Sequence, residues 1–161
     1  MKKLAIYAGT FDPITFGHVD LIVRSSEIFS NVILAIAQDT PKNTLFTLEE
    51  RVGMGKQVTC KIKNVKVMPF NGLLINFAKE MKCSVLIRGI RAYSDFEAEF
   101  QMALTNRQLA PSMETLFMMP KENHSYVSSG VVKQIARLGA DIRKFVPGPV
   151  VLHLKKKFAE K

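Results

Sequence analysis

Short apolar runs alternate with segments of helical periodicity along the chain, and this alternation constrains the fold more than any other feature of the sequence. Five apolar runs are short enough to be buried strands: 4–8, 32–37, 65–68, 85–87 and 115–118. Six segments have the apolar spacing of a helix: 19–29, 48–59, 73–82, 95–109, 129–138 and about 150–158. Strands that alternate with helices favour a parallel sheet with helices on both faces. The sequence therefore predicts a doubly wound α/β fold around a five-stranded parallel sheet.

Nothing in the sequence divides the chain into separate domains. Its 161 residues contain no repeat, low-complexity tract or linker, so we expect a single domain over residues 1–161, with a C-terminal helix at about 150–158. No apolar run approaches the roughly 18 residues of a membrane span. Strand-like and turn residues follow Met1 too soon for a signal peptide. We therefore expect a cytoplasmic protein with no membrane partner.

Cysteine and histidine positions predict neither a disulfide nor a metal site made by the chain itself. Cys60 and Cys83 lack a metal-ligand spacing, and in a cytoplasmic chain they favour buried thiols. The histidines, His18, His124 and His153, are too scattered to form a zinc motif.

Two helix starts have the pattern of a capping box, in which the first and fourth residues exchange hydrogen bonds. The first is Thr47-Leu48-Glu49-Glu50 and the second is Ser94-Asp95-Phe96-Glu97. The glycines of Gly53-Met54-Gly55-Lys56 lie inside the helix that follows the first box. We therefore do not interpret them as part of a phosphate-binding P-loop.

The formal net charge of +9 indicates an anionic partner: a nucleic acid, an acidic lipid or a phosphorylated small molecule. Part of this charge lies in the tail, at Lys155-Lys156-Lys157 and Lys161, where a solvated helix end is the simpler reading. No helix-turn-helix, zinc-finger or RNP-like aromatic pattern accompanies the charge, so we expect no nucleic-acid partner. A salt-sensitive gel shift would be the sign of one.

Four polar segments follow predicted strands: 9–18, 38–44, 88–91 and 120–129. In an open parallel sheet, ligands bind beyond the carboxyl ends of the strands. Because all four segments fall at that edge, together they predict a ligand site there.

The stretch GTFDPITFGH links the first strand to the first helix and has the residues of an anion-binding turn. Gly9 permits a close approach or an unusual backbone conformation, and Thr10 adds a hydroxyl group. Gly17 and His18 begin the helix, where free N–H groups and the helix dipole favour an anion. The His18 ring could donate a hydrogen bond to phosphate, more strongly if it is protonated.

Arg88 and Arg91 flank Gly89 directly after a buried strand. Arginine makes planar, bidentate contacts with phosphate and stays charged. We favour phosphate binding because a glycine leaves the backbone open to a ligand. The alternative is ordinary ion pairs with acidic residues of the next helix, namely Asp95, Glu97 or Glu99.

The hydroxyl groups of Ser128 and Ser129 precede a helix, where they fit equally well a simple N-cap or a phosphate contact. Lys42 by itself is weak evidence for a phosphate site. Its expected place at the same sheet edge as the other candidates strengthens that evidence.

These stretches also resemble a known family. GTFDPITFGH resembles the T/HxGH signature of the nucleotidyltransferase superfamily, and the fuller set resembles bacterial phosphopantetheine adenylyltransferases. That set is 7–13, 46–51, 86–91, the helix from Asp95 to Arg107, and Ser128-Ser129. The resemblance extends from Lys3 to about Pro147, with departures at Ala8, Phe16, His124 and Gly130 that remove no predicted catalytic group.

The resemblance implies a Rossmann-like fold and the transfer of the adenylyl group of ATP to 4'-phosphopantetheine. The products would be dephospho-coenzyme A and pyrophosphate, in the penultimate step of coenzyme A synthesis. It also implies Mg²⁺ bound with ATP, and a homohexamer built as a dimer of trimers. The attacking phosphate is already a nucleophile, so in-line attack needs neither a general base nor a covalent intermediate.

The same resemblance implies roles for individual residues. His18 and Thr10 would stabilise charge at the α-phosphate, and Arg91 would hold the ATP phosphates. The remaining ATP contacts would be Phe11, Gly89, Ile90, Glu99, His124, Ser125, Tyr126, Val127, Ser128, Ser129 and Gly130. The contacts with 4'-phosphopantetheine would be Thr10, Lys42, Leu74, Arg88 and Asn106.

Two alternatives to this function stay open at the level of sequence. The first is a nucleotidyltransferase with another acceptor, such as nicotinamide mononucleotide or glycerol phosphate, although the pairing of Lys42 with Arg88 favours phosphopantetheine. The second is a ligand-binding regulator that has lost catalysis. The presence of Thr10, His18 and Arg91 argues against it.

Overall fold

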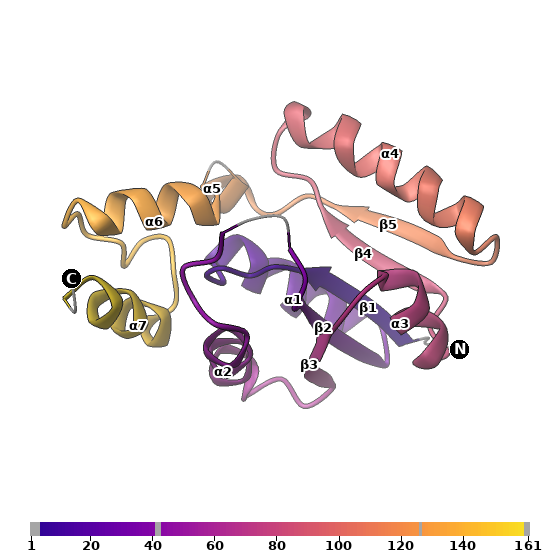
Figure 1. The fold of residues 1–161 in the computed structure, drawn as a ribbon, viewed down its shortest axis with the longest axis horizontal. Coiled ribbons are helices and arrows are strands. Elements are labelled where there is room, and N and C mark those ends of the chain that lie inside the picture. The colour runs from indigo at the N-terminus through magenta and orange to yellow at the C-terminus, as the bar shows by residue number, and fades with distance from the viewer. Residues whose placement is uncertain (1–3, 41–42, 126, 160–161) are drawn as a thin grey trace.

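The computed structural model describes residues 4–40, 43–125 and 127–159, with the backbone only at 93, 94, 124 and 125. Five parallel strands form one sheet: β1 (Leu4–Gly9), β2 (Asn31–Ala37), β3 (Val65–Phe70), β4 (Val85–Gly89) and β5 (Glu114–Met118). Their order in the sheet is β3-β2-β1-β4-β5 (Figure 1). This confirms the predicted sheet. It also places the reversal of strand order, where such folds bind ligands, beside β1.

Helices connect and follow the strands in the predicted places. They are α1 (Phe16–Ile28), α2 (Leu48–Thr59), α3 (Leu74–Glu80), α4 (Tyr93–Leu109), α5 (Glu122–Ser125), α6 (Ser129–Arg137) and α7 (Gly148–Ala159). The short α5 was not predicted, because four residues are too few to show helical periodicity. The predicted start of α1 at residue 19 was three residues too late, since Thr15 caps the helix earlier.

Alternate residues of the strands enter two separate cores, which confirms helices on both faces of the sheet. On β1, Ala5 and Tyr7 pack with side chains of α1, α2, α6 and α7. Ile6 and Ala8 pack on the opposite face, largely with side chains of α3. Both faces of the strand are therefore apolar, as in a parallel sheet buried on both sides.

One of the two predicted capping boxes is confirmed and the other is wrong. Thr47 and Glu50 exchange the expected hydrogen bonds at the start of α2, at 3.2 and 2.8 Å. Helix α4 instead begins at Tyr93, and its N-cap residue, Ala92, makes no side-chain cap. The pattern at Ser94 fails because α4 begins one residue earlier, which places Ser94 inside the helix and not at its N-cap. The Asp95 carboxylate accepts the backbone N–H of Arg91 at 3.2 Å and pairs with the Arg91 guanidinium.

The cysteines were both expected to be buried, and this holds for Cys83 alone. Cys60, the C-cap residue at the end of α2, is exposed. Within the described ranges, no helix has both the length and the apolar character needed to cross a membrane.

The C-terminal helix α7 packs beside α2 and the loop before it. The ammonium group of Lys157 lies 3.0 Å from the Glu50 carboxylate and 5.7 Å from the centre of the Phe46 ring. The His153 ring meets the edge of Phe46 at 6.4 Å. This end of the chain therefore packs against the segment that leads into α2.

Candidate active site

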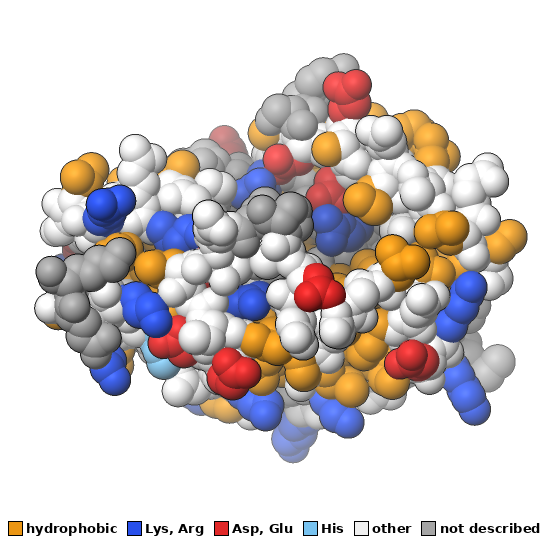
Figure 2. Space-filling model, in the orientation of Figure 1, with side chains coloured by type: hydrophobic (Ala, Val, Ile, Leu, Met, Phe, Trp, Pro, Cys, Tyr) orange, Lys and Arg blue, Asp and Glu red, His pale blue; other side chains and the backbone are white. Residues whose placement is uncertain are grey.

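A cavity of about 720 Å³ opens at the carboxyl edge of the sheet. Figure 2 shows the molecule hollowed near the centre of that view, with basic and acidic side chains inside. The cavity wall includes these predicted site residues: Thr10, Phe11, His18, Leu74, Arg88, Gly89, Arg91, Glu99, Asn106, Ser128, Ser129 and Gly130. Most of the candidates chosen from sequence are thus brought together, although they lie up to 120 positions apart in the chain.

Several predicted residues are not placed in this cavity. Ile90 and Val127 do not line it: the Ile90 N–H donates to the Met118 carbonyl at 3.0 Å, and the Val127 side chain is buried in the core. Lys42 and Tyr126 lie outside the described residues, as do the side chains of His124 and Ser125.

The imidazole of His18 is oriented by the cap of its own helix. The backbone N–H of Thr15 donates to Nδ1 of His18 at 2.9 Å, while the Thr15 hydroxyl caps α1 from the other side. Because Nδ1 accepts, the neutral ring carries its proton on Nε2. The cap thus selects the tautomer that can donate a hydrogen bond from Nε2.

Burial of the His18 ring, and then the nearby charge of Arg91, lower the pKa of the imidazole from its usual 6.5 to about 4. His18 is therefore neutral at physiological pH without a ligand. The sequence had left open a protonated ring as the stronger donor, but the surroundings of the ring disfavour it.

We expect an NMR titration of the ligand-free protein to place the His18 pKa near 4, far below an unfolded histidine. A folded-state pKa below the unfolded value means that the unfolded chain binds the proton more readily. The contribution of His18 to stability is therefore complete above pH 6.5 and decreases as the pH falls towards 4. A His18→Gln variant should lack this part of the pH dependence, and a His18 pKa of 6 or more would contradict the assignment.

Two glycines at the site serve packing as well as access. A Cβ on Gly9 would lie 3.1 Å from the Phe11 ring, which meets the edges of Tyr7 and His18 at 5.2 and 5.0 Å. A Cβ on Gly89 would lie 2.7 Å from Leu21 of α1. The space beside Gly89 is thus taken by a side chain of α1, and the expectation that this glycine leaves the backbone open to a ligand is wrong on that side.

Sequence reasoning missed Asp12 and Lys133. The buried Asp12 carboxylate accepts the backbone N–H groups of Leu45 and Phe46, both at 3.0 Å. It also pairs with the Lys133 ammonium group at 2.5 Å. Asp12 thereby joins the β1–α1 loop to the segment before α2 and to α6. Asp12-Pro13 has only the sequence pattern of a turn, so nothing in the sequence marked the residue as buried.

Arg51 of α2 was also missed as a contact of the loop between β1 and α1, which we call the site loop. Its buried guanidinium donates to the carbonyls of Thr10 at 2.9 Å, Ala37 at 2.8 Å and Phe46 at 3.3 Å. These carbonyls belong to the chain after β1, the end of β2 and the segment before α2. One side chain therefore connects two parts of the cavity wall, at Thr10 and Ala37, with the segment before α2.

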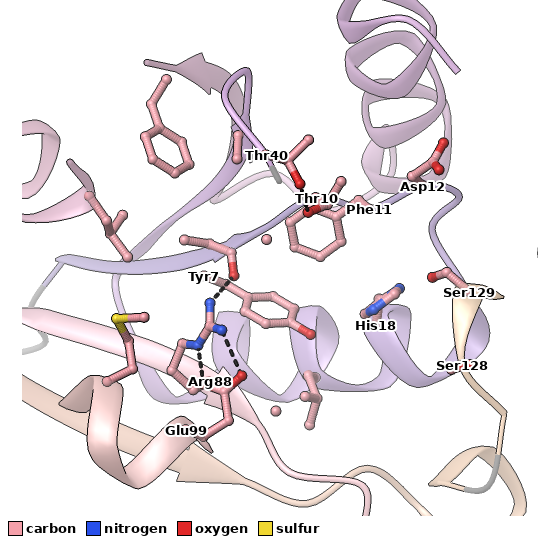
Figure 3. A pocket seen from close by; sticks show the side chains of 18 of the residues that line it. Tyr7, Thr10, Phe11, Asp12, His18, Thr40, Arg88, Glu99, Ser128 and Ser129 are labelled. Atoms are coloured by element: carbon pink, nitrogen blue, oxygen red, sulfur yellow. Dashed lines mark hydrogen bonds and ion pairs between the residues drawn. The ribbon is translucent and has the colours of Figure 1, made fainter. Parts of the chain in front are cut away.

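Both arginines of the predicted phosphate site are held by carboxylates of α4. Arg88 binds Glu99 through Nε at 2.6 Å and Nη2 at 2.7 Å, and its Nη1 donates to the Ala8 carbonyl at 2.8 Å (Figure 3). Arg91 binds Asp95 through Nε at 3.0 Å and Nη2 at 3.3 Å. The ion pairs considered from the sequence are thus present, and both arginines also line the cavity.

The serine pair begins α6 beside the site loop. The Ser128 hydroxyl accepts the Val131 N–H at 3.2 Å as the N-cap, and the Ser129 hydroxyl donates to the Pro13 carbonyl at 2.7 Å. In Figure 3, Ser129 lies close to His18. The starts of two helices, α1 and α6, therefore meet at one wall of the cavity, which favours an anion there.

The fold and this wall define a class: an α/β protein that binds a phosphorylated ligand at the reversal of its strand order. Residues 6–135 match the cytidylyltransferase-like family. Over 161 residues the chain is 49% identical to the phosphopantetheine adenylyltransferase of Methylacidiphilum infernorum (isolate V4), covering 99% of this chain and 93% of that protein. The chain therefore belongs to the cytidylyltransferase-like family, within its phosphopantetheine adenylyltransferases.

Solved structures with the same fold are more distant in sequence. A putative nicotinate-nucleotide adenylyltransferase from Vibrio parahaemolyticus superposes with a TM-score of 0.72 at 17% identity, over 100% of this chain and 98% of that one. The nicotinic acid mononucleotide adenylyltransferase of Plasmodium falciparum gives 0.70 at 15% identity, over 97% and 96%. At such identities the likeness supports the Rossmann-like fold and nothing finer.

Proposed function

We propose that this protein transfers the adenylyl group of ATP to 4'-phosphopantetheine, giving dephospho-coenzyme A and pyrophosphate in the cytoplasm. The observation that carries the proposal is the 49% identity with a phosphopantetheine adenylyltransferase over nearly the whole of both chains. The predicted catalytic residues His18, Thr10 and Arg91 line one cavity, which is consistent with this reaction.

The reaction needs positioning and charge stabilisation more than a base, because the acceptor phosphate is already an anion. Nε2–H of the neutral His18 is a fixed donor for an oxygen of the α-phosphate. Thr10 adds a hydroxyl on the same loop, 3.5 Å from the hydroxyl of Thr40. Arg91 and the start of α6 supply positive charge for the β- and γ-phosphates, which leave as pyrophosphate.

The acceptor would lie across the other half of the cavity. There the wall turns apolar, with Phe70, Leu73, Leu74, Met102 and Leu109, and Asn106 adds an amide. This composition suits a pantetheine arm, which combines a hydrocarbon chain with amide groups. Arg88, with Lys42 by resemblance, would hold the acceptor phosphate.

Mg²⁺ would enter with ATP. Among the described residues, no three histidine, cysteine or acidic side chains gather as a metal-binding group. A Mg²⁺ ion usually keeps several waters and binds substrate phosphates. Such an ion would therefore be held mainly by the nucleotide, and it would neutralise part of the charge of the leaving pyrophosphate.

We propose a homohexamer as the assembled form. Helix α4 leaves large apolar side chains in solvent, among them Phe96, Phe100 and Leu104. The rings of Phe96 and Phe100 stack at 5.5 Å and continue towards Phe117 at 6.3 Å. A contiguous apolar patch of this kind favours contact with another copy of the chain.

The test of the proposed function is pyrophosphate release from ATP and Mg²⁺ with three acceptors in parallel: 4'-phosphopantetheine, nicotinamide mononucleotide and glycerol 3-phosphate. Release with phosphopantetheine alone is the expected result. Release with another acceptor would keep adenylyl transfer and change the substrate. If a folded protein that binds ATP released no pyrophosphate with any of the three acceptors, the result would favour the non-catalytic regulator.

Arg88→Ala is expected to raise KM for 4'-phosphopantetheine about 10- to 100-fold, because one hydrogen-bonded charge on the acceptor phosphate is lost. KM for ATP should change about twofold or less. Arg107→Ala is the control, since it breaks another Arg–Glu pair, between α4 and β5, outside the cavity. An unchanged KM for phosphopantetheine in Arg88→Ala would refute the assignment of Arg88.

A further inference from the structure

We propose that Asp95 and Glu99 are internal counter-ions that compete with phosphate ligands for Arg91 and Arg88, and so determine which anions the site retains. The proposal rests on the proposed function only in treating these two arginines as the anion-binding groups. Nothing in the family comparison assigns Asp95 a role. The two ion pairs support the proposal, as does the position of Arg88, Arg91 and Glu99 in the cavity wall.

Each carboxylate occupies the edge of a guanidinium that a phosphate would use. Glu99 takes Nε and Nη2 of Arg88 at 2.6 and 2.7 Å, and Asp95 takes the same two nitrogens of Arg91 at 3.0 and 3.3 Å. A phosphate binds arginine most strongly through such a pair of parallel N–H groups. Bidentate binding of phosphate through these same two nitrogens therefore requires the carboxylate to leave.

The two carboxylates come from one face of one helix. Asp95 and Glu99 are four residues apart on α4. Glu99, Met102 and Asn106 line the cavity, and Asp95 is linked to it through its pair with Arg91. The two arginines come from one segment, at the end of β4 and just after it. The pairs thus form a matched set: without ligand, each arginine of the segment has a partner on the facing helix.

A phosphate ligand binds only if its other contacts compensate for the loss of the ion pair between arginine and carboxylate. A free inorganic phosphate gains one guanidinium contact and must break another, so its net gain is small. A ligand that also contacts the apolar wall or the α6 start has additional binding energy with which to displace the carboxylate. The counter-ions therefore select against isolated inorganic anions, including the pyrophosphate product, and favour its release.

A purely structural role for these pairs gives the opposite expectation. If Asp95 and Glu99 only fix α4 to the sheet, their removal loosens the site and weakens the binding of anions. If they compete with anions, their removal strengthens it. Because damage to the fold does not produce tighter binding, the sign of the change distinguishes the two roles.

The test is calorimetric titration of the full chain with inorganic pyrophosphate and inorganic phosphate at constant ionic strength near 0.15 M. The variants are Asp95→Asn and Glu99→Gln, which keep the size of the side chain and remove its charge. Glu97→Gln is the matched control: it removes the same charge from the exposed side of α4, outside the cavity. At this salt a distant charge is largely screened.

We expect pyrophosphate to bind about 3-fold more tightly to Asp95→Asn and about 5-fold more tightly to Glu99→Gln than to the wild-type chain, in the range of partly exposed ion pairs. Glu97→Gln should match the wild type. If Glu99→Gln does not fold, Asp95→Asn decides. Equal or weaker binding by the folded variants, or no binding by any of the proteins, overturns the proposal. Because the titration involves no turnover, failure of the proposed function would appear separately in the acceptor assay.

Discussion

His18→Ala lowers kcat about 10²- to 10³-fold, because the alanine removes a pre-oriented donor from the position where charge develops on the α-phosphate. The Nε2–H of His18 is fixed by the bond from the Thr15 N–H to Nδ1 at 2.9 Å. It therefore needs no rearrangement during the reaction. The affinity for ATP should change only a few-fold, because most of the nucleotide contacts remain.

The measurement is steady-state turnover together with the equilibrium affinity for ATP. Since His18 also accepts a hydrogen bond within the cap of α1, thermal unfolding must be followed in parallel. His153→Ala is the control, because that ring lies on α7 against Phe46 and outside the cavity. Retained turnover in His18→Ala, or a common loss of turnover and ATP affinity through unfolding, would remove the catalytic role of His18.

Arg51→Met is expected to lower the free energy of unfolding by about 2–4 kcal/mol, because three carbonyls lose a buried charged donor. Methionine fills a similar volume, so the loss reports hydrogen bonding more than a cavity. Arg137→Met is the control: it removes an exposed arginine and should change stability by about 0.5 kcal/mol or less. Urea unfolding measures both.

At temperatures where Arg51→Met is still folded, its turnover should be lower than that of the wild-type chain. The reason is that Arg51 holds the Thr10 carbonyl and so the start of the site loop. Arg51→Lys should restore only part of this effect, because one ammonium group cannot reach carbonyls of three segments in the arrangement of a guanidinium. Wild-type stability in Arg51→Met would show that water replaces the guanidinium without cost.

The sheet and most helices could be predicted because their signals are local. The apolar run at 32–37 and the period of 48–59 specify an element without reference to the rest of the chain. The cap at Ser94 was predicted wrongly, since the helix begins earlier, at Tyr93, after an N-cap residue without a side-chain cap. A cap pattern does not determine where a helix begins, because a helix can also begin without a side-chain cap.

The candidate site was predicted as a set of positions, not as a set of contacts. The carboxyl edge of a parallel sheet collects residues such as His18, Arg88 and Ser129 whatever their separation in sequence. The roles of Asp12 and Arg51 depend on which backbone groups remain unpaired in the folded chain. Those groups, at Leu45, Phe46 and Ala37, become known only when the loops are in place.

The bond from Ser129 to Pro13 and the pair of Lys133 with Asp12 span 116 and 121 positions of the chain. The loop they support, at about residues 9–18, is synthesised well before α6. During translation it must wait for α6 to leave the ribosome before these contacts can form. A nascent chain that ends before residue 129 thus has this loop without its support, and competence for adenylyl transfer arises only after α6 has been synthesised.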